Sequence, residues 1–353
     1  MGSILLTINP GSTSTKVAVF EDEKELFSNT LRHTAENLAP FKKMIDQYEF
    51  REKIILSYLD ENKISHLDAV VGRGGLLRSI PSGTYEVDEE MIQDLKEAKK
   101  GEHASNLGGI LAKEIGNKYK APAFIVDPVV VDELEDIARI SGMPELERVS
   151  IFHALNQKAI ARKTAASLNK PYEELNLILV HLGGGISVGA HKKGKIVDVN
   201  NALDGDGAFS PERSGGVPAG GLLKMAFSGK YTHDELKKKI TGQGGLVAYL
   251  GTNSGIEVTE KMKKGDQKAE LVYQAMAYQV AKDVGSMAAV LKGKVDAIAI
   301  TGGIAYDKTF VGWIEERINF ISKVIVFPGE DEMLALCQGG LRVLKGSEKA
   351  KKY

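Results

Sequence analysis

The same order of strands and turns occurs twice along this chain of 353 residues. In the first half, an apolar run at residues 4–8 leads into a turn of small polar residues, residues 16–20 are again extended, and a charged turn follows. In the second half, residues 177–182 lead into a glycine turn, and extended segments follow at 188–191 and 196–199. A duplicated core is the simplest interpretation, and chance hairpins are the alternative because the halves share no residue-level identity.

Strands that alternate with helices predict an α/β fold. A chain of this length exceeds what one ordinary core organises, so we expect two domains. The predicted helices are 41–59, 107–115, 154–168, 218–228, 268–291 and 333–344, and the further predicted strands are 69–71, 123–126, 297–300 and 323–327.

Charge and composition exclude several classes of function. Lys and Arg total 46 against 47 Asp and Glu, so the chain has no general basic field for a nucleic acid. No apolar stretch is long enough to cross a bilayer, and the segment at 4–8 is too short for a signal peptide. The single cysteine, Cys337, excludes an intramolecular disulfide. We therefore expect a soluble cytoplasmic protein that binds neither nucleic acid nor membrane.

The turn after the first strand carries groups that bind phosphate. Gly11 is followed by four hydroxyl residues, among them Ser12 and Ser14, and then by Lys16. Backbone N–H groups, hydroxyls and an ammonium group thus surround one small volume. An ordinary hairpin turn is the alternative for this motif taken alone.

Two glycine turns also follow apolar strands, and together the three turns favour a nucleotide site. The usual phosphate-binding fingerprints fail: Gly11 reaches Lys16 without a second glycine, and Val188 stands where a dinucleotide motif requires glycine. A P-loop NTPase and a simple dehydrogenase are therefore disfavoured. The glycines of the two turns are Gly183, Gly184 and Gly185, and Gly302 and Gly303.

Two arginines lie among glycines. Arg73 stands between Gly72 and Gly74 after a predicted strand, and Arg213 lies in segment 200–217, which is rich in Asn, Asp and Gly and shows no periodicity. A planar guanidinium suits carboxylate or phosphate, whereas a surface salt bridge is the commoner fate of one arginine. The pair favours anion binding.

Histidines and carboxylates supply further candidates. His103 and His153 precede predicted helices, where an imidazole can bind a charged ligand, whereas His181 on an apolar strand suits a core position. Asp127 ends a strand, and the acidic residues 330–332 precede the last helix. These oxygens suit Mg²⁺ shared with phosphates, and helix capping or a strand-end turn is the alternative.

At these residues the chain resembles the acetate and butyrate kinases of the acetokinase family. The first signature is carried by Asn9, Gly11, Ser12, Thr13, Ser14 and Lys16, and the remaining motifs fall in family order over nearly the whole chain. Residues 126–135 and 198–207 resemble the butyrate and branched-chain fatty-acid kinases. Gly184 stands where acetate kinases carry Asn, which also fits the butyrate branch, and the spacing around Arg73 is shorter than in acetate kinases.

The resemblance implies an α/β fold of the acetate and sugar kinase/Hsp70/actin type, with a duplicated ribonuclease H-like core and a cleft between two domains. Residues 1–149 with 333–353 would form the carboxylate and phosphate side, and 150–332 the nucleotide side. The implied reaction transfers phosphate reversibly between ATP and a short-chain carboxylate, giving ADP and an acyl phosphate, with Mg²⁺. A homodimer or higher homo-oligomer is expected by the same analogy.

The resemblance also implies roles for individual residues. Arg73 and Arg213 would orient the carboxylate and neutralise the phosphoryl oxygens, and His153 would contact the transferring group. Asn9, Asp127 and Glu332 would arrange Mg²⁺, with Asp331 as an alternative to Glu332. Lys16, Ser12 and Ser14 would line the phosphate path, the two glycine turns would approach the nucleotide, and His103 would lie in the catalytic cleft.

Two alternatives remain open. A nucleotide-driven switch of the actin or Hsp70 kind would share the phosphate turns but has no use for Arg73, Arg213 and His153 around an acceptor. A sugar kinase needs a carboxylate base for a hydroxyl, and Asp127 is the one strand-end candidate.

Overall fold

The computed structural model describes residues 2–353 and divides into two compact units. Unit 1 comprises the chain up to Asp132 together with Asp331–Tyr353, and unit 2 is Glu133–Glu330. The first boundary precedes the expected one at 149/150 because Glu133 is bonded into unit 2: its carboxylate accepts from Lys158 Nζ at 2.7 Å and from the Ile196 amide at 3.0 Å. That the units are hinged domains stays a prediction.

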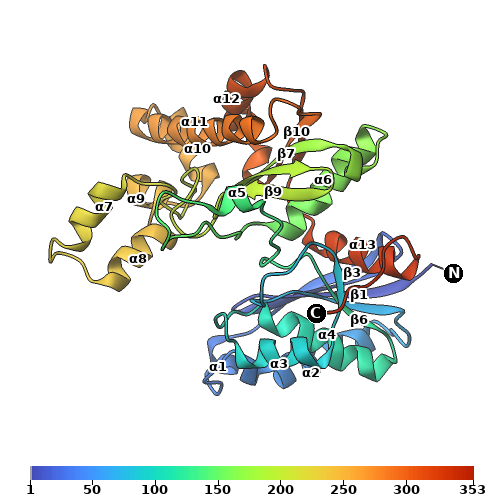
Figure 1. Cartoon of the computed structure of the whole chain (residues 1–353). Helices are drawn as coiled ribbons and strands as arrows, with labels where there is room; N and C mark the ends of the chain where they lie inside the picture. The colour runs from blue at the N-terminus through green and yellow to red at the C-terminus, as the bar shows by residue number, and fades with distance from the viewer. Residues whose placement is uncertain (1) are drawn as a thin grey trace. The chain divides into compact units, whose positions relative to one another are not determined.

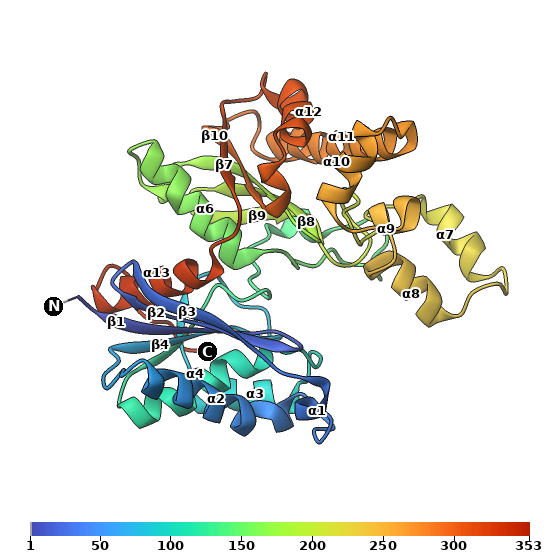
Figure 2. The same ribbon diagram turned by 180° about the vertical axis from the view of Figure 1, so that it is seen from behind.

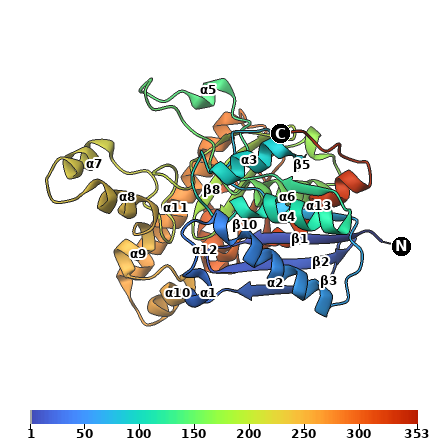
Figure 3. The same cartoon turned by 90° about the horizontal axis from the view of Figure 1, so that it is seen from below.

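Unit 1 is a six-stranded sheet in the order β3-β2-β1-β4-β6-β5. β1, β2 and β3 are antiparallel neighbours, whereas β1, β4 and β6 are parallel (Figure 3). Helices α2, α3 and α4 lie on one face and α13 on the other (Figures 1 and 2). The elements are β1 (Ile4–Pro10), β2 (Ser14–Glu21), β3 (Lys24–Arg32), α1 (Ala35–Leu38), α2 (Tyr48–Glu61), β4 (Ala69–Arg73), β5 (Thr84–Glu86), α3 (Glu89–Glu97), α4 (Asn106–Tyr119), β6 (Ala123–Val126) and α13 (Glu332–Leu344).

Unit 2 is a five-stranded sheet in the order β11-β10-β7-β8-β9. Alternate residues of β7 face opposite sides: Leu177 packs with Ile160 of α6, and Ile178 packs with Met276 of α11. The elements are α5 (Asp136–Arg139), α6 (Ala154–Ser167), β7 (Asn176–Leu182), β8 (Ile186–Lys192), β9 (Lys195–Val199), α7 (Ala219–Ala226), α8 (His233–Thr241), α9 (Gly245–Leu250), α10 (Gly255–Lys263), α11 (Gln267–Val290), β10 (Ala297–Gly302), α12 (Lys308–Ile318) and β11 (Val324–Pro328).

The predicted duplication is confirmed by the two strand orders. In each sheet three consecutive strands pair antiparallel, and two later strands extend the sheet in parallel from the first of the three. Only β5, an antiparallel edge strand, breaks the correspondence. The predicted α/β class is confirmed as well. No helix among residues 2–353 combines the length and apolar character needed to span a membrane.

The predicted helix at 41–59 was wrong at its start. The α-helix begins at Tyr48, after a 3-10 turn at Ile45–Gln47. The reason is local bonding: the Asp46 carboxylate accepts from the Lys43 amide at 3.0 Å, and the Met44 amide donates to Glu102 at 3.0 Å. These side chains hold residues 43 and 44 in a bend ahead of the helix.

Strand register determines which side chains share an edge of each sheet. In unit 1, Ile8 pairs with Gly72, so the following residues Asn9 and Arg73 are neighbours, and Asn9 pairs across the hairpin with Lys16. In unit 2, His181 pairs with Thr301, so the two glycine turns follow adjacent strand ends.

The end of β4 is positioned by a glycine contact. A Cβ at Gly72 would lie 2.0 Å from the Gly108 carbonyl oxygen, and a Cβ at Gly108 would lie 2.1 Å from the Arg73 carbonyl oxygen. The backbones of β4 and α4 therefore touch directly, which fixes the strand that ends at Arg73 against the helix.

We expect Gly108→Ala to lower the free energy of unfolding by roughly 1–3 kcal/mol, because β4 and α4 must move apart. Gly285→Ala is the matched control: it is also a helix-interior glycine, nothing lies within 4 Å of its Cβ position, and the change should stabilise by about 0.5–1 kcal/mol. Urea denaturation followed by circular dichroism measures both. Equal effects of the two substitutions would contradict the contact.

Candidate active site

Unit 1 brings Asn9, Arg73 and Glu332 together at the ends of β1, β4 and the start of α13. Arg73 Nη1 lies 3.0 Å from Glu332 Oε1 and 3.3 Å from Asn9 Oδ1, and Asn9 Nδ2 donates to Glu332 Oε2 at 2.5 Å. All three side chains are partly exposed, so the cluster can reach a ligand. The arrangement joins a cation, an amide and a carboxylate at one edge of the sheet.

Asp331 and Glu332 have different surroundings. Asp331 is the N-cap of α13, and its carboxylate accepts from the Leu334 amide at 3.1 Å. Glu332 instead faces Arg73 and Asn9. Because the Asp331 carboxylate serves the helix end, Glu332 is the better placed of the two for a ligand at this cluster.

The donor set at this cluster fits one mode of metal binding. No three His, Cys, Asp or Glu side chains gather as a metal cage among residues 2–353. Mg²⁺ usually keeps several waters and takes one or two carboxylates plus phosphate oxygens. Glu332 with the Asn9 amide is compatible with that sparse set.

The turn between β1 and β2 presents unpaired polar groups. The hydroxyls of Ser12 and Ser14 and the ammonium of Lys16 have no hydrogen-bond or ion-pair partner within residues 2–353. Ser12 and Lys16 are exposed. These groups are therefore available to a ligand, as the phosphate-binding hypothesis requires.

His103 lies before α4 with a defined tautomer. Its Nδ1 accepts from the Ser105 amide at 3.2 Å, which leaves the proton of the neutral ring on Nε2. Desolvation and then the positive charge of Arg73 lower the pKa of His103, although the ring reaches the surface. His103 is thus a neutral hydrogen-bond donor on the same unit as Arg73.

Asp127 is buried at the end of β6. Its Oδ1 accepts from Ser82 Oγ at 2.6 Å and from the Gly83 amide at 2.7 Å. The backbone is left-handed, with φ 38°, which is costly for a residue other than glycine. The surroundings hold this carboxylate in one orientation.

Unit 2 places His153, the N-cap residue of α6, against His181 of β7. The two rings stack with centroids 3.8 Å apart and planes 14° apart. His153 Nδ1 lies 2.9 Å from Ser187 Oγ. Ser187 Oγ in turn accepts from Gln157 Nε2 at 2.9 Å. His181 contacts Asn156 Oδ1 through Nδ1 at 2.8 Å and Glu330 Oε1 through Nε2 at 3.2 Å. His181 was expected in the core and is buried, but its ring also stacks on that of His153.

Arg213 lies against the first glycine turn of unit 2. A Cβ at Gly185 would fall 1.8 Å from Arg213 Nη1, so only glycine leaves room for the guanidinium. Nη1 donates to the Ala202 carbonyl, whereas Nε is buried with no partner within residues 2–353. Desolvation lowers the pKa of Arg213. Arg213 is thus a half-buried guanidinium with one unsatisfied nitrogen, which is a feature of anion-binding sites.

The other glycines of the turns divide into two kinds. Gly183 and Gly302 are packed: their Cβ positions lie 2.9 Å from His181 Nε2 and 2.3 Å from the Leu182 carbonyl oxygen. Gly184 has its nearest atom at 3.9 Å, and Gly303 has none within 4 Å. The packed glycines bring strands together, and the open ones leave backbone accessible.

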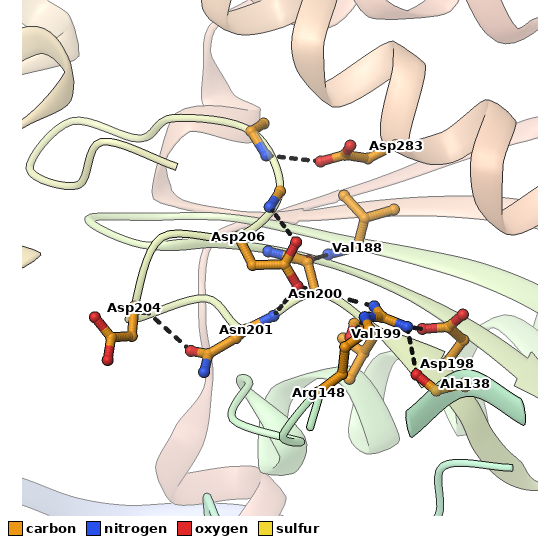
Figure 4. Close-up of polar contacts among 12 residues, drawn as sticks. Ala138, Arg148, Val188, Asp198, Val199, Asn200, Asn201, Asp204, Asp206 and Asp283 are labelled. Carbon is orange, nitrogen blue, oxygen red and sulfur yellow. Dashed lines mark hydrogen bonds and ion pairs between the residues drawn. The ribbon is translucent and has the colours of Figure 1, made fainter. Parts of the chain in front are cut away.

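The segment 200–217 has no helix or strand but is held at several points (Figure 4). Arg148 bonds Asp198 of β9 at 2.9 Å and lies 3.8 Å from Asp206 of the segment, and Asp283 of α11 accepts from the Ala208 amide at 2.7 Å. Asn200 accepts from the Val188 amide at 2.7 Å. The loop that carries Arg213 is therefore fixed to β8, β9 and α11.

Comparison with known proteins identifies the family. The chain is 61% identical over 351 residues to butyrate kinase 2 of Clostridium acetobutylicum, and 57% identical to butyrate kinase 1 of that organism, each covering 99% of both chains. The chain belongs to the acetokinase family. The profile of that family matches residues 147–320. Porphyromonas gingivalis acetate kinase has a similar fold, with a TM-score of 0.80 over 97% of this chain and 100% of its own, at 20% identity.

Asp283 predicts a pH dependence of stability. Burial, with a smaller contribution from the charge of Asp206, raises the pKa of Asp283 to about 6. Because the folded protein then binds the proton more tightly than the unfolded chain, wild-type stability falls as pH rises from about 4 to 6, by up to roughly 2–3 kcal/mol.

Asp283→Asn keeps an acceptor for the Ala208 amide and removes this titration. Relative to wild type, the variant should therefore gain stability between pH 4 and pH 7 in urea denaturation. A difference between the two proteins that does not change with pH would contradict the assignment.

Proposed function

We propose that this chain is an ATP-dependent kinase that phosphorylates butyrate or a branched analogue at its carboxyl group, reversibly, to give an acyl phosphate and ADP. The observation that carries the proposal is 61% identity over 99% of the chain to a butyrate kinase. The two clusters of cationic and hydrogen-bonding groups at strand ends support it.

Charge is the main obstacle in this reaction. One carboxylate oxygen attacks the γ-phosphorus, and the bond from that phosphorus to the oxygen bridging the β- and γ-phosphates breaks. Both reactants are anions, and the carboxylate has no proton to lose. Catalysis is then positioning and neutralisation. Arg73 in unit 1 and Arg213 in unit 2 supply guanidinium groups for these tasks.

His153 and the glycine turns are assigned to the phosphoryl group and the nucleotide. Ser187 Oγ accepts from Gln157, so its hydroxyl can donate to His153 Nδ1, which puts the proton of the neutral His153 ring on Nε2. Gly184 and Gly303, which have open space around them, would let phosphate or adenosine approach the backbone.

Mg²⁺ would be held by Glu332 and Asn9, and when bound it neutralises phosphate charge. Asp127 would act near them through oriented waters. Lys16, Ser12 and Ser14 would bind phosphate oxygens on the same unit, and His103 would donate through Nε2.

The alternatives are less favoured. A sugar kinase needs a base poised to remove a hydroxyl proton, but Asp127 already accepts two hydrogen bonds on Oδ1. A switch ATPase leaves the two arginines without an acceptor to neutralise. We further propose a cytoplasmic location and a homo-oligomer, by analogy with the family.

The reaction itself is tested by trapping its product. Incubation with ATP, Mg²⁺, butyrate and hydroxylamine should yield butyryl hydroxamate together with stoichiometric ADP. ADP release without hydroxamate would favour the switch ATPase, and phosphorylation of a sugar in place of butyrate would favour the sugar kinase.

Loss of either arginine should abolish most turnover. We expect Arg73→Ala and Arg213→Ala to lower kcat by about 10³-fold or more, the range seen for arginines in other phosphoryl-transfer enzymes. Arg317→Ala is the control, since Arg317 is an exposed arginine that stacks on Tyr278 at 5.0 Å. Near-normal kcat in either site variant would remove that arginine from the mechanism.

Gly185→Ala should reproduce the loss of Arg213 without removing it, because the added methyl group would occupy the position of Nη1. The same assay should give a fall in kcat of at least about 10²-fold. Gly220→Ala in α7, with nothing within 4 Å of its Cβ position, is the matched control. Equal activity of the two variants would show that Arg213 does not need the space.

A further inference from the structure

Arg51 of α2 lies directly beneath the turn between β1 and β2. Its side chain is fully buried, at 0% exposure. Nη1 donates to the carbonyl oxygens of Gly11 at 2.8 Å and Ser14 at 3.0 Å, and Nη2 donates to that of Ser12 at 3.0 Å. One guanidinium thus binds three of the four carbonyls at positions 11–14.

These bonds decide which side of the turn faces outward. The fourth carbonyl, of Thr13, accepts from the His33 amide at 2.9 Å, so every carbonyl of the turn points toward the protein. The amides of Ser12 and Thr13 have no acceptor within residues 2–353. The Gly11 amide donates to the Ser14 carbonyl at 2.8 Å, so the two amides left for a ligand are those of Ser12 and Thr13, which is how backbone concavities bind anions.

The charge of Arg51 has no counter-ion. No carboxylate of residues 2–353 forms an ion pair with it, and its remaining partners are Gln47 Oε1 and Thr15 Oγ1. Burial lowers the pKa of Arg51 to about 10, which still leaves it charged at neutral pH. The adjacent His33 adds no charge, because desolvation and then Arg51 lower its pKa to about 4. A buried cation without a counter-ion among its neighbours is costly.

We infer that Arg51 is a positioning residue for the phosphate-binding turn, and that its unpaired charge is balanced by a phosphate of the bound nucleotide. The inference rests on the proposed function, and it assigns Arg51 a role through the turn rather than in contact with a reacting atom.

The test compares three variants with a control on the same helix. Arg51→Met removes the charge and the fork of donors, and Arg51→Lys keeps the charge alone. Gln47→Met leaves Arg51 in place but removes the amide oxygen that orients it. Ile55→Ala is the control, because Ile55 is buried on α2 but its side chain has no polar atom that could bond the turn.

Kinetics in the hydroxamate assay should separate positioning from stability. We expect kcat/KM for ATP to fall about 10²-fold in Arg51→Met, while KM for butyrate stays within about threefold of wild type. Arg51→Lys should bind ATP more tightly than Arg51→Met in titration calorimetry but remain slow. Gln47→Met should show a smaller loss of kcat/KM for ATP. Ile55→Ala should keep wild-type kcat and KM at a thermal stability similar to that of Arg51→Met.

Two outcomes would overturn the inference. One is wild-type kcat/KM for ATP in a folded Arg51→Met or, if that variant does not fold, in both Gln47→Met and Arg51→Lys. The other is a parallel rise of KM for ATP and for butyrate in Arg51→Met, which would indicate general loosening of the unit. If the wild-type protein makes no hydroxamate, the proposed function fails, and the ATP affinities from calorimetry still decide the role of Arg51.

Discussion

Parallel strand pairing in each unit is the constraint on which the candidate site depends. Adjacent parallel strands end at the same edge of a sheet, so any polar residue placed just after them meets its neighbours there. The pairs β1–β4 and β7–β10 do this with Asn9 beside Arg73 and with the two glycine turns side by side. A slip of one residue in either register would turn these groups to the other face of the sheet.

The two units present their cations in different ways. In unit 1 the guanidinium of Arg73 is already paired with a carboxylate, Glu332, and both side chains are partly exposed. In unit 2 the guanidinium of Arg213 lies against the Gly185 backbone, and its buried Nε lacks a partner in the described part of the chain. Removing Arg73 therefore leaves the Glu332 carboxylate in contact with water, whereas removing Arg213 leaves a space beside Gly185. The two substitutions thus disturb the structure in different ways.

The fold could be predicted from sequence because local patterns carried it. Apolar runs marked the strands, and small polar residues marked the turns that follow them, which was enough for the duplicated α/β core. The grouping of Asn9, Arg73 and Glu332 was implied by the family resemblance instead, because Asn9 and Glu332 lie at opposite ends of the chain, and the roles of these residues stay a prediction. The choice between Asp331 and Glu332 needed the structure, since it depends on where α13 begins. The start of α2 was missed because the apolar spacing continues through residues 41–47, which contacts to Asp46 and Glu102 hold in a bend and a 3-10 turn.

Arg51 escaped prediction because it lies in no motif and acts through contacts with positions 11–15, far away in the sequence. His181 was expected in the core, but its contacts with Asn156, His153 and Glu330 are equally distant in sequence and were not foreseen. An arginine on an amphipathic helix is ordinarily a surface residue. Its complete burial without a carboxylate is unfavourable unless something else gains from it, and the carbonyls of the turn account for the hydrogen bonds but not for the charge. An anion at the turn would balance the charge of Arg51.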